Sequence, residues 1–107
     1  MNKEVVQIHC TSTMVYMTKK EKQISFRRAL QQALINIRDV ETAEGFLSNM
    51  FTDKEVDEFA IRLQIIKRVK DGVPQREIAE ELDTSIGTVS RGAREVKYKS
   101  TKFTDSL

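Results

Sequence analysis

The 107-residue chain has few of the residues that hold small folds together through disulfides or metals. Cys10 is its only cysteine, which excludes an internal disulfide and is typical of a protein of the reducing cytoplasm. His9 is its only histidine, and one thiol with one imidazole argue against a Cys/His zinc site. Tryptophan is absent altogether. We therefore expect a cytoplasmic protein with no metal site.

Two further absences limit the function. No apolar run approaches the roughly 18 residues of a membrane span, and no secretory signal is visible, so no membrane partner is expected. The chain has no converging acid–base set and no phosphate loop, so we assign no catalytic residue and expect no enzyme. Its 39% hydrophobic and 32% charged residues fit one soluble globular domain with a modest core.

Residues 75–94, QREIAEELDTSIGTVSRGAR, have the pattern of a helix-turn-helix, a DNA-reading unit. Apolar residues mark the buried sides of two short helices: Ile78, Ala79 and Leu82 in the first, Ile86 and Val89 in the second. Asp83 occupies a turn position that favours the left-handed region, which Asp tolerates better than most residues. Ser85 or Thr84 can cap the second helix.

The charge of this hairpin distinguishes it from a plain pair of packed helices. The first helix is acidic, with Glu77, Glu80 and Glu81. Residues 86–102 contain a single acid, Glu95, and five basic residues: Arg91, Arg94, Lys97, Lys99 and Lys102. A positive second helix behind an acidic first one favours entry into a DNA groove. The exposed side of that helix offers Gly87, Thr88, Ser90, Arg91 and Arg94.

Upstream of the hairpin the chain is predicted to be helical from about residue 18. Residues 1–17 show no clean period and are interpreted as a mobile N-terminal arm or an upstream extension, with Met17 as an alternative start. Residues 18–107 are predicted to form a single helical domain. One amphipathic helix is expected over about 19–39, a short one over about 41–49, and a long one from Asp53 to a left-handed cap at Gly72. Residues 100–107 form part of a final helix or fray.

The start of the long helix is the most specific local signal. Thr52 and Glu55 have the spacing of a capping box, and Phe51 and Val56 occupy the hydrophobic-staple positions around it. Pro74 suits the first turn of the first hairpin helix, while Val73 before it is a poor cap. Helices of this length on so short a chain bury their apolar stripes only partly within one monomer, so we expect an all-α homodimer.

Residues 51–97, FTDKEVDEFAIRLQIIKRVKDGVPQREIAEELDTSIGTVSRGAREVK, resemble the tryptophan (Trp) repressor family of bacterial transcription regulators. The resemblance implies an intertwined helical dimer with six helices per subunit. It also implies a small-molecule partner in place of a cofactor: L-tryptophan as corepressor, held between the long central helix and the reading helix.

The resemblance assigns ligand-binding roles to six residues: Thr52, Arg62, Thr88, Arg91, Gly92 and Glu95. In the family the indole lies flat between the two arginines, and the second arginine pairs with the ligand carboxylate. A guanidinium can both stack on an aromatic face and fork onto a carboxylate, which lysine cannot do. Gly92 removes a side chain where the ligand approaches backbone. Glu95 stands where the family has a serine, and its carboxylate can pair with a ligand ammonium or with Arg91.

The resemblance also implies contacts with double-stranded operator DNA. With Arg94 from the exposed side of the reading helix, the assigned residues are Gln75, Arg76, Ile86, Gly87, Thr88, Ser90, Arg94 and Lys97. Arg76 is the best candidate for direct readout, because bidentate arginine to guanine is the commonest specific contact. Ala79 replaces a family lysine, the loop before the hairpin is one residue shorter, and the C-terminal helix region is truncated.

Three hypotheses follow. The first is a dimeric repressor that needs L-tryptophan or a related amino acid. The second is a constitutive DNA-binding regulator with a vestigial pocket, in which Glu95 neutralises Arg91; its binding would fall with salt and ignore amino acids. The third is an interaction module that resembles the promoter-recognition domain of a sigma factor and works beside polymerase.

Overall fold

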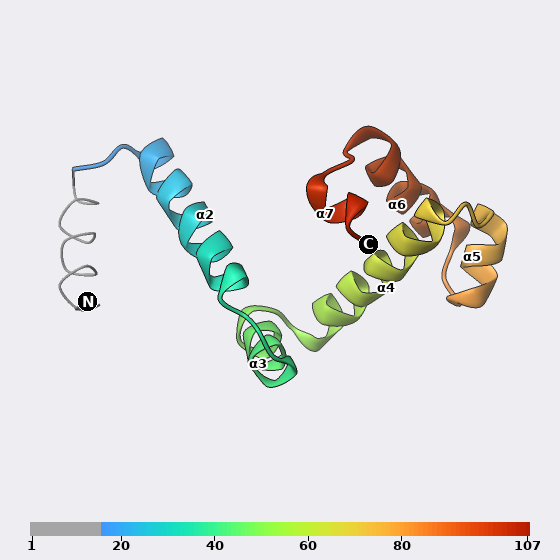
Figure 1. Ribbon diagram of the computed structural model, residues 1–107, viewed down its shortest axis with the longest axis horizontal. Helices are drawn as coiled ribbons and strands as arrows, with labels where there is room; N and C mark the ends of the chain where they lie inside the picture. The colour runs from blue at the N-terminus through green and yellow to red at the C-terminus, as the bar shows by residue number, and fades with distance from the viewer. Residues whose placement is uncertain (1–15) are drawn as a thin grey trace. The chain divides into compact units, whose positions relative to one another are not determined.

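The computed structural model describes residues 16–107, and in this range it contains helices and no strand (Figure 1). The fold is all-α, as predicted. Its helices are α2 (Lys19–Ile35), α3 (Val40–Met50), α4 (Asp53–Lys70), α5 (Gln75–Glu81), α6 (Ile86–Tyr98) and α7 (Lys102–Asp105). Most of the predicted N-terminal arm, residues 1–15, lies outside the described residues.

The chain divides into two compact units, one that ends at Gly45 and one that runs from Phe46 to Leu107. The second unit contains α4, α5, α6 and α7, and it carries the predicted site residues. The single domain expected over residues 18–107 stays a prediction.

α2 begins where the sequence changes to a helical period. Thr18 and Glu21 form a capping box, in which the Glu21 amide donates to Thr18 Oγ1 at 3.1 Å and the Thr18 amide donates to Glu21 Oε1 at 3.1 Å. The helix ends at Ile35, four residues before the predicted end at Asp39. No residue of α2 is buried, and Leu34 of its apolar stripe is 50% exposed. The stripe is therefore uncovered within its own unit.

α3 lies within one residue of its predicted bounds at each end. Asp39 precedes it and acts as its cap: the Thr42 amide donates to Asp39 Oδ1 at 2.7 Å, and the Thr42 hydroxyl donates to Asp39 Oδ2 at 3.0 Å. These hydrogen bonds, the backbone one first, lower the pKa of Asp39 from 3.8.

The capping box at the start of α4 is present as predicted. The Glu55 amide donates to Thr52 Oγ1 at 3.2 Å, and the Thr52 amide donates to Glu55 Oε1 at 2.9 Å. Phe51, at the staple position, packs edge-on against Phe59 with ring centroids 5.0 Å apart, and against Phe46 at 6.2 Å. These aromatic contacts hold the start of α4 in addition to the hydrogen bonds of the capping box.

The end of α4 explains why Val73, a poor helix cap, stands before Pro74. Gly72 has φ +80°, the Val73 amide donates to the Arg68 carbonyl at 3.1 Å, and the Gly72 amide donates to the Val69 carbonyl at 3.0 Å. This pair of hydrogen bonds is a Schellman motif, whose next residue is usually apolar. Val73 is that residue and packs against the core. Pro74 is the N-cap of α5 in place of Val73. The proline was predicted in the first turn of the helix and lies one position before it.

The same motif recurs between α5 and α6. Asp83 has φ +52°, as expected for the turn; its amide donates to the Glu80 carbonyl at 3.3 Å, and the Thr84 amide donates to the Ala79 carbonyl at 3.0 Å. Ser85 caps α6 by accepting from the Thr88 amide at 3.1 Å. The two predicted helices and their turn are therefore present.

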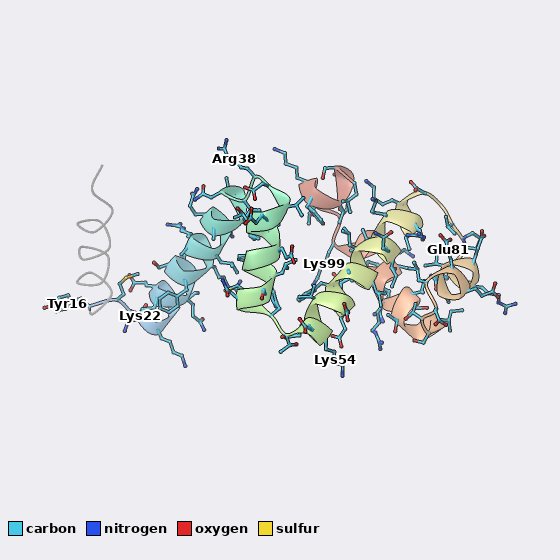
Figure 2. The ribbon with its side chains drawn as sticks, turned by 90° about the horizontal axis from the view of Figure 1, so that it is seen from below. Tyr16, Lys22, Arg38, Lys54, Glu81 and Lys99 are labelled. Atoms are coloured by element: carbon cyan, nitrogen blue, oxygen red, sulfur yellow. The ribbon has the colours of Figure 1, made fainter. Side chains whose placement is uncertain are left out.

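The core of the second unit joins α4, α5 and α6. Its buried centre is Ile65 from α4, Ile78 from α5 and Val89 from α6. Partly buried apolar residues pack around them: Val69, Val73, Ala79 and Leu82. Glu81, labelled on α5 in Figure 2, accepts from Arg68 of α4 at 2.8 and 3.0 Å. These contacts fix α5 and α6 against α4.

Candidate functional site: a cleft between α4 and α6

A cleft of about 790 Å³ lies between α4 and α6 and extends to α7. Three isoleucines of α4 line it: Ile61, Ile65 and Ile66. Its charged residues are Glu58, Arg62, Arg91, Glu95 and Lys99, and its other residues are Thr84, Thr88, Gly92, Thr101, Phe103 and Thr104. An apolar surface beside opposite charges suits a molecule with an apolar body and a charged end.

The cleft contains five of the six predicted ligand residues: Arg62, Thr88, Arg91, Gly92 and Glu95. They come from two helices: Arg62 lies on α4, at least 26 residues before the other four on α6, and the packing of α4 on α6 brings them together. Thr52 is not among the lining residues, and its hydroxyl is engaged with Glu55 at the start of α4. Its ligand role stays a prediction.

Arg62 is exposed, and its Cζ lies 5.5 Å from the centroid of the Phe59 ring one turn earlier on α4. This cation–π contact holds the guanidinium beside an aromatic face. A guanidinium stacked on one ring keeps its other face available for a second ring. The geometry is therefore compatible with an aromatic ligand.

Arg91 is exposed at the opposite wall of the cleft, one turn after Thr88. Its Nη2 donates to Thr88 Oγ1 at 3.4 Å, a long hydrogen bond. The Thr88 hydroxyl is also 2.8 Å from Ser85 Oγ. Because only a neutral hydroxyl partners this guanidinium in the described residues, its positive charge is available to an anion.

Gly92 is buried for a reason that differs from the predicted one. A Cβ built on Gly92 would lie 2.5 Å from Ile65 Cγ2, which is closer than any real contact. The glycine therefore allows α6 to pack closely on α4. Its ligand role stays a prediction.

Glu95 does not pair with Arg91 in the structure. Its Oε2 lies 3.8 Å from Nζ of Lys99, one turn further along α6 and labelled in Figure 2. Both side chains are more than half exposed, at 51% for Glu95 and 75% for Lys99. The pair is therefore a weak surface ion pair.

Sequence reasoning missed the wall that the C-terminal segment adds. Thr101 caps the short helix α7 by accepting from the Thr104 amide at 3.3 Å, and Thr104 is buried. Lys70 of α4 donates to the Leu107 carbonyl at 3.0 Å, and Figure 1 shows the marked C-terminus beside α4. Phe103, 58% exposed, thereby lines the cleft. The only signal was Thr101 with Thr104, a weaker form of the capping box.

The predicted DNA-binding residues lie on α5 and α6. Six are exposed: Gln75, Arg76, Ile86, Gly87, Arg94 and Lys97. Ser90 and Thr88 are partly buried. The Ser90 hydroxyl donates to Gln75 Oε1 at 2.8 Å and so links the two helices. Lys97 Nζ lies 5.3 Å from the Tyr98 ring centroid.

Within residues 16–107, no cluster of three or more His, Cys, Asp and Glu side chains is placed to hold a metal ion. In the same range no helix is both long enough and apolar enough to cross a membrane.

Comparison with known proteins gives a consistent result. The family described as "Trp repressor protein" matches residues 27–107. Proteins named "Trp operon repressor homolog" are similar to the chain: the one from Haemophilus influenzae strain Rd is 39% identical over 62 residues, 57% of this chain and 61% of the relative. Those from Actinobacillus succinogenes and Pasteurella multocida are 41% and 40% identical over 61 residues, 56% of this chain and 60% of each relative. The chain thus spans about three fifths of the length of these relatives. No solved structure gives a significant match.

Proposed function

Since this chain belongs to the Trp repressor family, we propose that it is a sequence-specific DNA-binding transcription repressor. It acts as a homodimer and takes L-tryptophan or a related amino acid as its corepressor. The observation that carries the proposal is the cleft between α4 and α6, which Arg62 and Arg91 from two different helices line together with three isoleucines of α4.

The ligand part of the proposal follows from the chemistry of that cleft. Ile61, Ile65 and Ile66 suit an apolar ring. Arg91 suits a carboxylate, because a guanidinium can donate two parallel hydrogen bonds to it. Arg62 then stacks on the face of the ring. An aromatic amino acid satisfies all three groups together.

The DNA part is supported by the surface of α5 and α6. Arg76, Arg94 and Lys97 are exposed on these helices, and Ile86 and Gly87 lie at the exposed N-terminal end of α6. The N-terminal residues of a reading helix are those that contact base edges in the major groove. We assign Arg76 to guanine and the other cations to phosphates.

The dimer is supported by large apolar side chains that are exposed on their own helices. Within residues 16–107 the buried hydrophobic residues are Ile65, Ile66, Ile78 and Val89 alone. Exposed large apolar side chains on α2, α3 and α4 include Ile24, Phe26, Leu30, Leu34, Ile35, Met50, Phe59 and Leu63. A second copy of the chain is the partner that would cover them.

Ligand and DNA are coupled through α6. This helix forms one wall of the cleft, and its exposed side carries proposed DNA contacts. A ligand that binds between α4 and α6 favours one arrangement of the two helices, and DNA binding that needs this arrangement becomes stronger. The vestigial-pocket hypothesis rested on an Arg91–Glu95 pair, and the pairing of Glu95 with Lys99 disfavours it.

The test begins with selection of double-stranded DNA from a random pool by the purified protein, with and without L-tryptophan. Fluorescence anisotropy on the selected sequence then measures affinity. We expect L-tryptophan to raise operator affinity about 5- to 150-fold, the usual range of allosteric coupling. If the protein selects the same DNA and binds it with equal affinity in both conditions, L-tryptophan is rejected as corepressor. The proposal of a sequence-specific DNA-binding protein then remains. Failure to bind any DNA alone would favour the polymerase-dependent module.

Two arginines one turn apart on α6 provide a matched pair for this assay. Arg91→Ala removes the carboxylate partner in the cleft, so operator binding should lose its response to L-tryptophan. Arg94→Ala removes an exposed cation, so operator affinity should fall with and without ligand while calorimetric binding of L-tryptophan persists. An unchanged ligand response in Arg91→Ala would contradict the assignment of the cleft.

A further inference from the structure

A series of aromatic contacts runs along the start of α4 and ends at the cleft. Phe46 of α3 packs edge-on against Phe51 with ring centroids 6.2 Å apart, and Phe51 packs edge-on against Phe59 at 5.0 Å. The centroid of the Phe59 ring in turn lies 5.5 Å from Cζ of Arg62. Of these four residues, only Arg62 lines the cleft. The three rings therefore reach the cleft through one guanidinium.

The Phe59 ring is the interaction that orients this guanidinium. Within residues 16–107 the ion pairs are Arg68–Glu81 and Glu95–Lys99, so no carboxylate pairs with Arg62. A long side chain without a partner samples many rotamers. Phe59 lies three residues before Arg62, a spacing that makes the two side chains neighbours on the helix surface. Their cation–π contact favours the rotamers in which the guanidinium lies beside the ring.

Phe59 is itself held by the start of the helix. Its ring meets that of Phe51 at an angle of 74°, an edge-to-face arrangement that restricts both rings. Phe51 directly precedes Thr52, the N-cap, whose capping box with Glu55 has both of its hydrogen bonds. The ring that Arg62 contacts is therefore supported by the capped end of α4.

We propose that Phe59 is a positioning residue that orients Arg62 for an aromatic ligand. The Phe59 ring contacts the guanidinium from outside the cleft, and the ring of the ligand stacks on the side of the guanidinium that faces into the cleft. Phe59 touches no part of the ligand and acts through Arg62. This inference rests on the proposed function, since it concerns the ligand of the same cleft.

An arginine that is oriented in advance binds a ligand more tightly. When a ligand immobilises a long side chain, the rotamer freedom that the side chain loses weakens the binding. A side chain that is already held before binding loses less of this freedom. Leucine in place of Phe59 would keep an apolar side chain at the same position, but it has no π face to attract a guanidinium. The ring itself is therefore the feature to remove.

Calorimetric titration of the full-length protein with L-tryptophan tests this role in three variants. Phe59→Leu removes the ring, so L-tryptophan should bind about three- to tenfold more weakly than to the wild-type protein. Phe59→Tyr keeps the ring face and should bind L-tryptophan within about twofold of the wild-type affinity. Phe46→Leu is the matched control, because it removes a ring of the same series that does not contact Arg62. Its affinity should also stay within about twofold.

NMR spectroscopy of the ligand-free protein measures the orientation of Arg62 separately. An aromatic ring shifts the resonances of protons that lie over its face to high field. The side-chain protons of Arg62 should show this shift in the wild-type protein, in Phe59→Tyr and in Phe46→Leu, and should lose it in Phe59→Leu. Phe59 is 41% exposed and lies outside the buried core, so its replacement should leave the fold intact, which circular dichroism checks.

The outcomes separate this inference from the proposed function. Wild-type affinity in Phe59→Leu, or no high-field shift of Arg62 in the wild-type protein, overturns the role of Phe59 and leaves the corepressor cleft in place. So does an equal loss of affinity in Phe59→Leu and in either Phe59→Tyr or Phe46→Leu, because the loss would then come from packing of the aromatic residues. If the folded wild-type protein does not bind L-tryptophan, the corepressor itself is rejected, and the role of Phe59 with it.

Discussion

At the scale of single residues, Gly92 connects the stability of the protein to its cleft. Ile65 fills the space beside it, and both residues line the cleft. The close approach of α6 to α4 depends on this one missing side chain. A residue that the sequence marks as a ligand contact is thus also a packing residue.

Gly92→Ala should destabilise the protein by about 1–3 kcal/mol, the usual cost of overpacking, because the new Cβ would overlap Ile65 Cγ2. Urea unfolding followed by circular dichroism measures this change. Adding Ile65→Leu, which removes the γ2 branch, should recover part of the loss.

Gly45→Ala is the matched control for that measurement. Gly45 lies inside α3, and a Cβ there would meet nothing within 4 Å. Alanine should therefore stabilise the protein by up to about 1 kcal/mol through helix propensity alone. Equal effects of the two substitutions would mean that the Gly92–Ile65 contact does not limit the packing.

Glu55 contributes to the dependence of the protein's folding stability on acid pH. The hydrogen bonds from the Thr52 amide and then the Thr52 hydroxyl lower the pKa of Glu55 below its ordinary value of 4.5. A lowered folded-state pKa stabilises the fold above pH 4.5, and this stabilisation is lost as the pH falls through the folded-state pKa. Glu21 and Asp39 have pKa values lowered in the same way.

The free energy of unfolding of Glu55→Gln should therefore be below that of the wild-type protein at neutral pH, and the difference should shrink as the pH falls below 4.5. Urea titrations over this range give the comparison. Glu44→Gln on α3 is the control, because no capping hydrogen bond to Glu44 occurs in the described residues. A difference that stays constant with pH would refute the role of the carboxylate charge.

At the scale of helices and turns, the sequence correctly predicted those features that depend on a few neighbouring residues. The starts of α4 and α6 follow from Thr52 and Ser85, and the turn follows from Asp83, because caps and left-handed turns are set by a few neighbouring residues. The cleft could be predicted only from the family resemblance, because residues 62 and 91 are far apart in the sequence and line one cleft only through the packing of α4 on α6. The wall at Phe103 was missed because the docking of α7 on α4 leaves no periodic signal.

The turn between α5 and α6 offers a test at this scale. Asp83 holds φ +52°, which costs a β-branched residue much more than Gly or Asp. Asp83→Val should lower stability by about 1–2 kcal/mol, and Asp83→Gly should be neutral or stabilising. Thermal unfolding of the two variants decides this. A well-tolerated valine would show that the turn adopts another conformation in solution.

At the scale of the whole molecule, the uncovered apolar stripe of α2 predicts an obligate assembly. Leu34→Glu places a charge on this stripe and should reduce both dimer content and helicity. Gln31→Glu adds the same charge at an exposed polar position of α2 and should change neither. Sedimentation velocity and circular dichroism at the same concentrations provide the readout. A stable, fully helical monomer in Leu34→Glu would argue against an obligate assembly. Unchanged dimer content would argue against a dimer that uses α2.

The residues that line the cleft fall into two groups that differ in how readily the fold tolerates their substitution. Ile65 and Gly92 are held by the core, so drift at either position costs folding before it alters recognition. Glu95, Lys99 and Phe103 are exposed at the cleft, where substitutions are tolerated by the fold. Under the proposed function, related chains can therefore change the ligand of the cleft at these exposed positions while the packing of α6 on α4 stays the same.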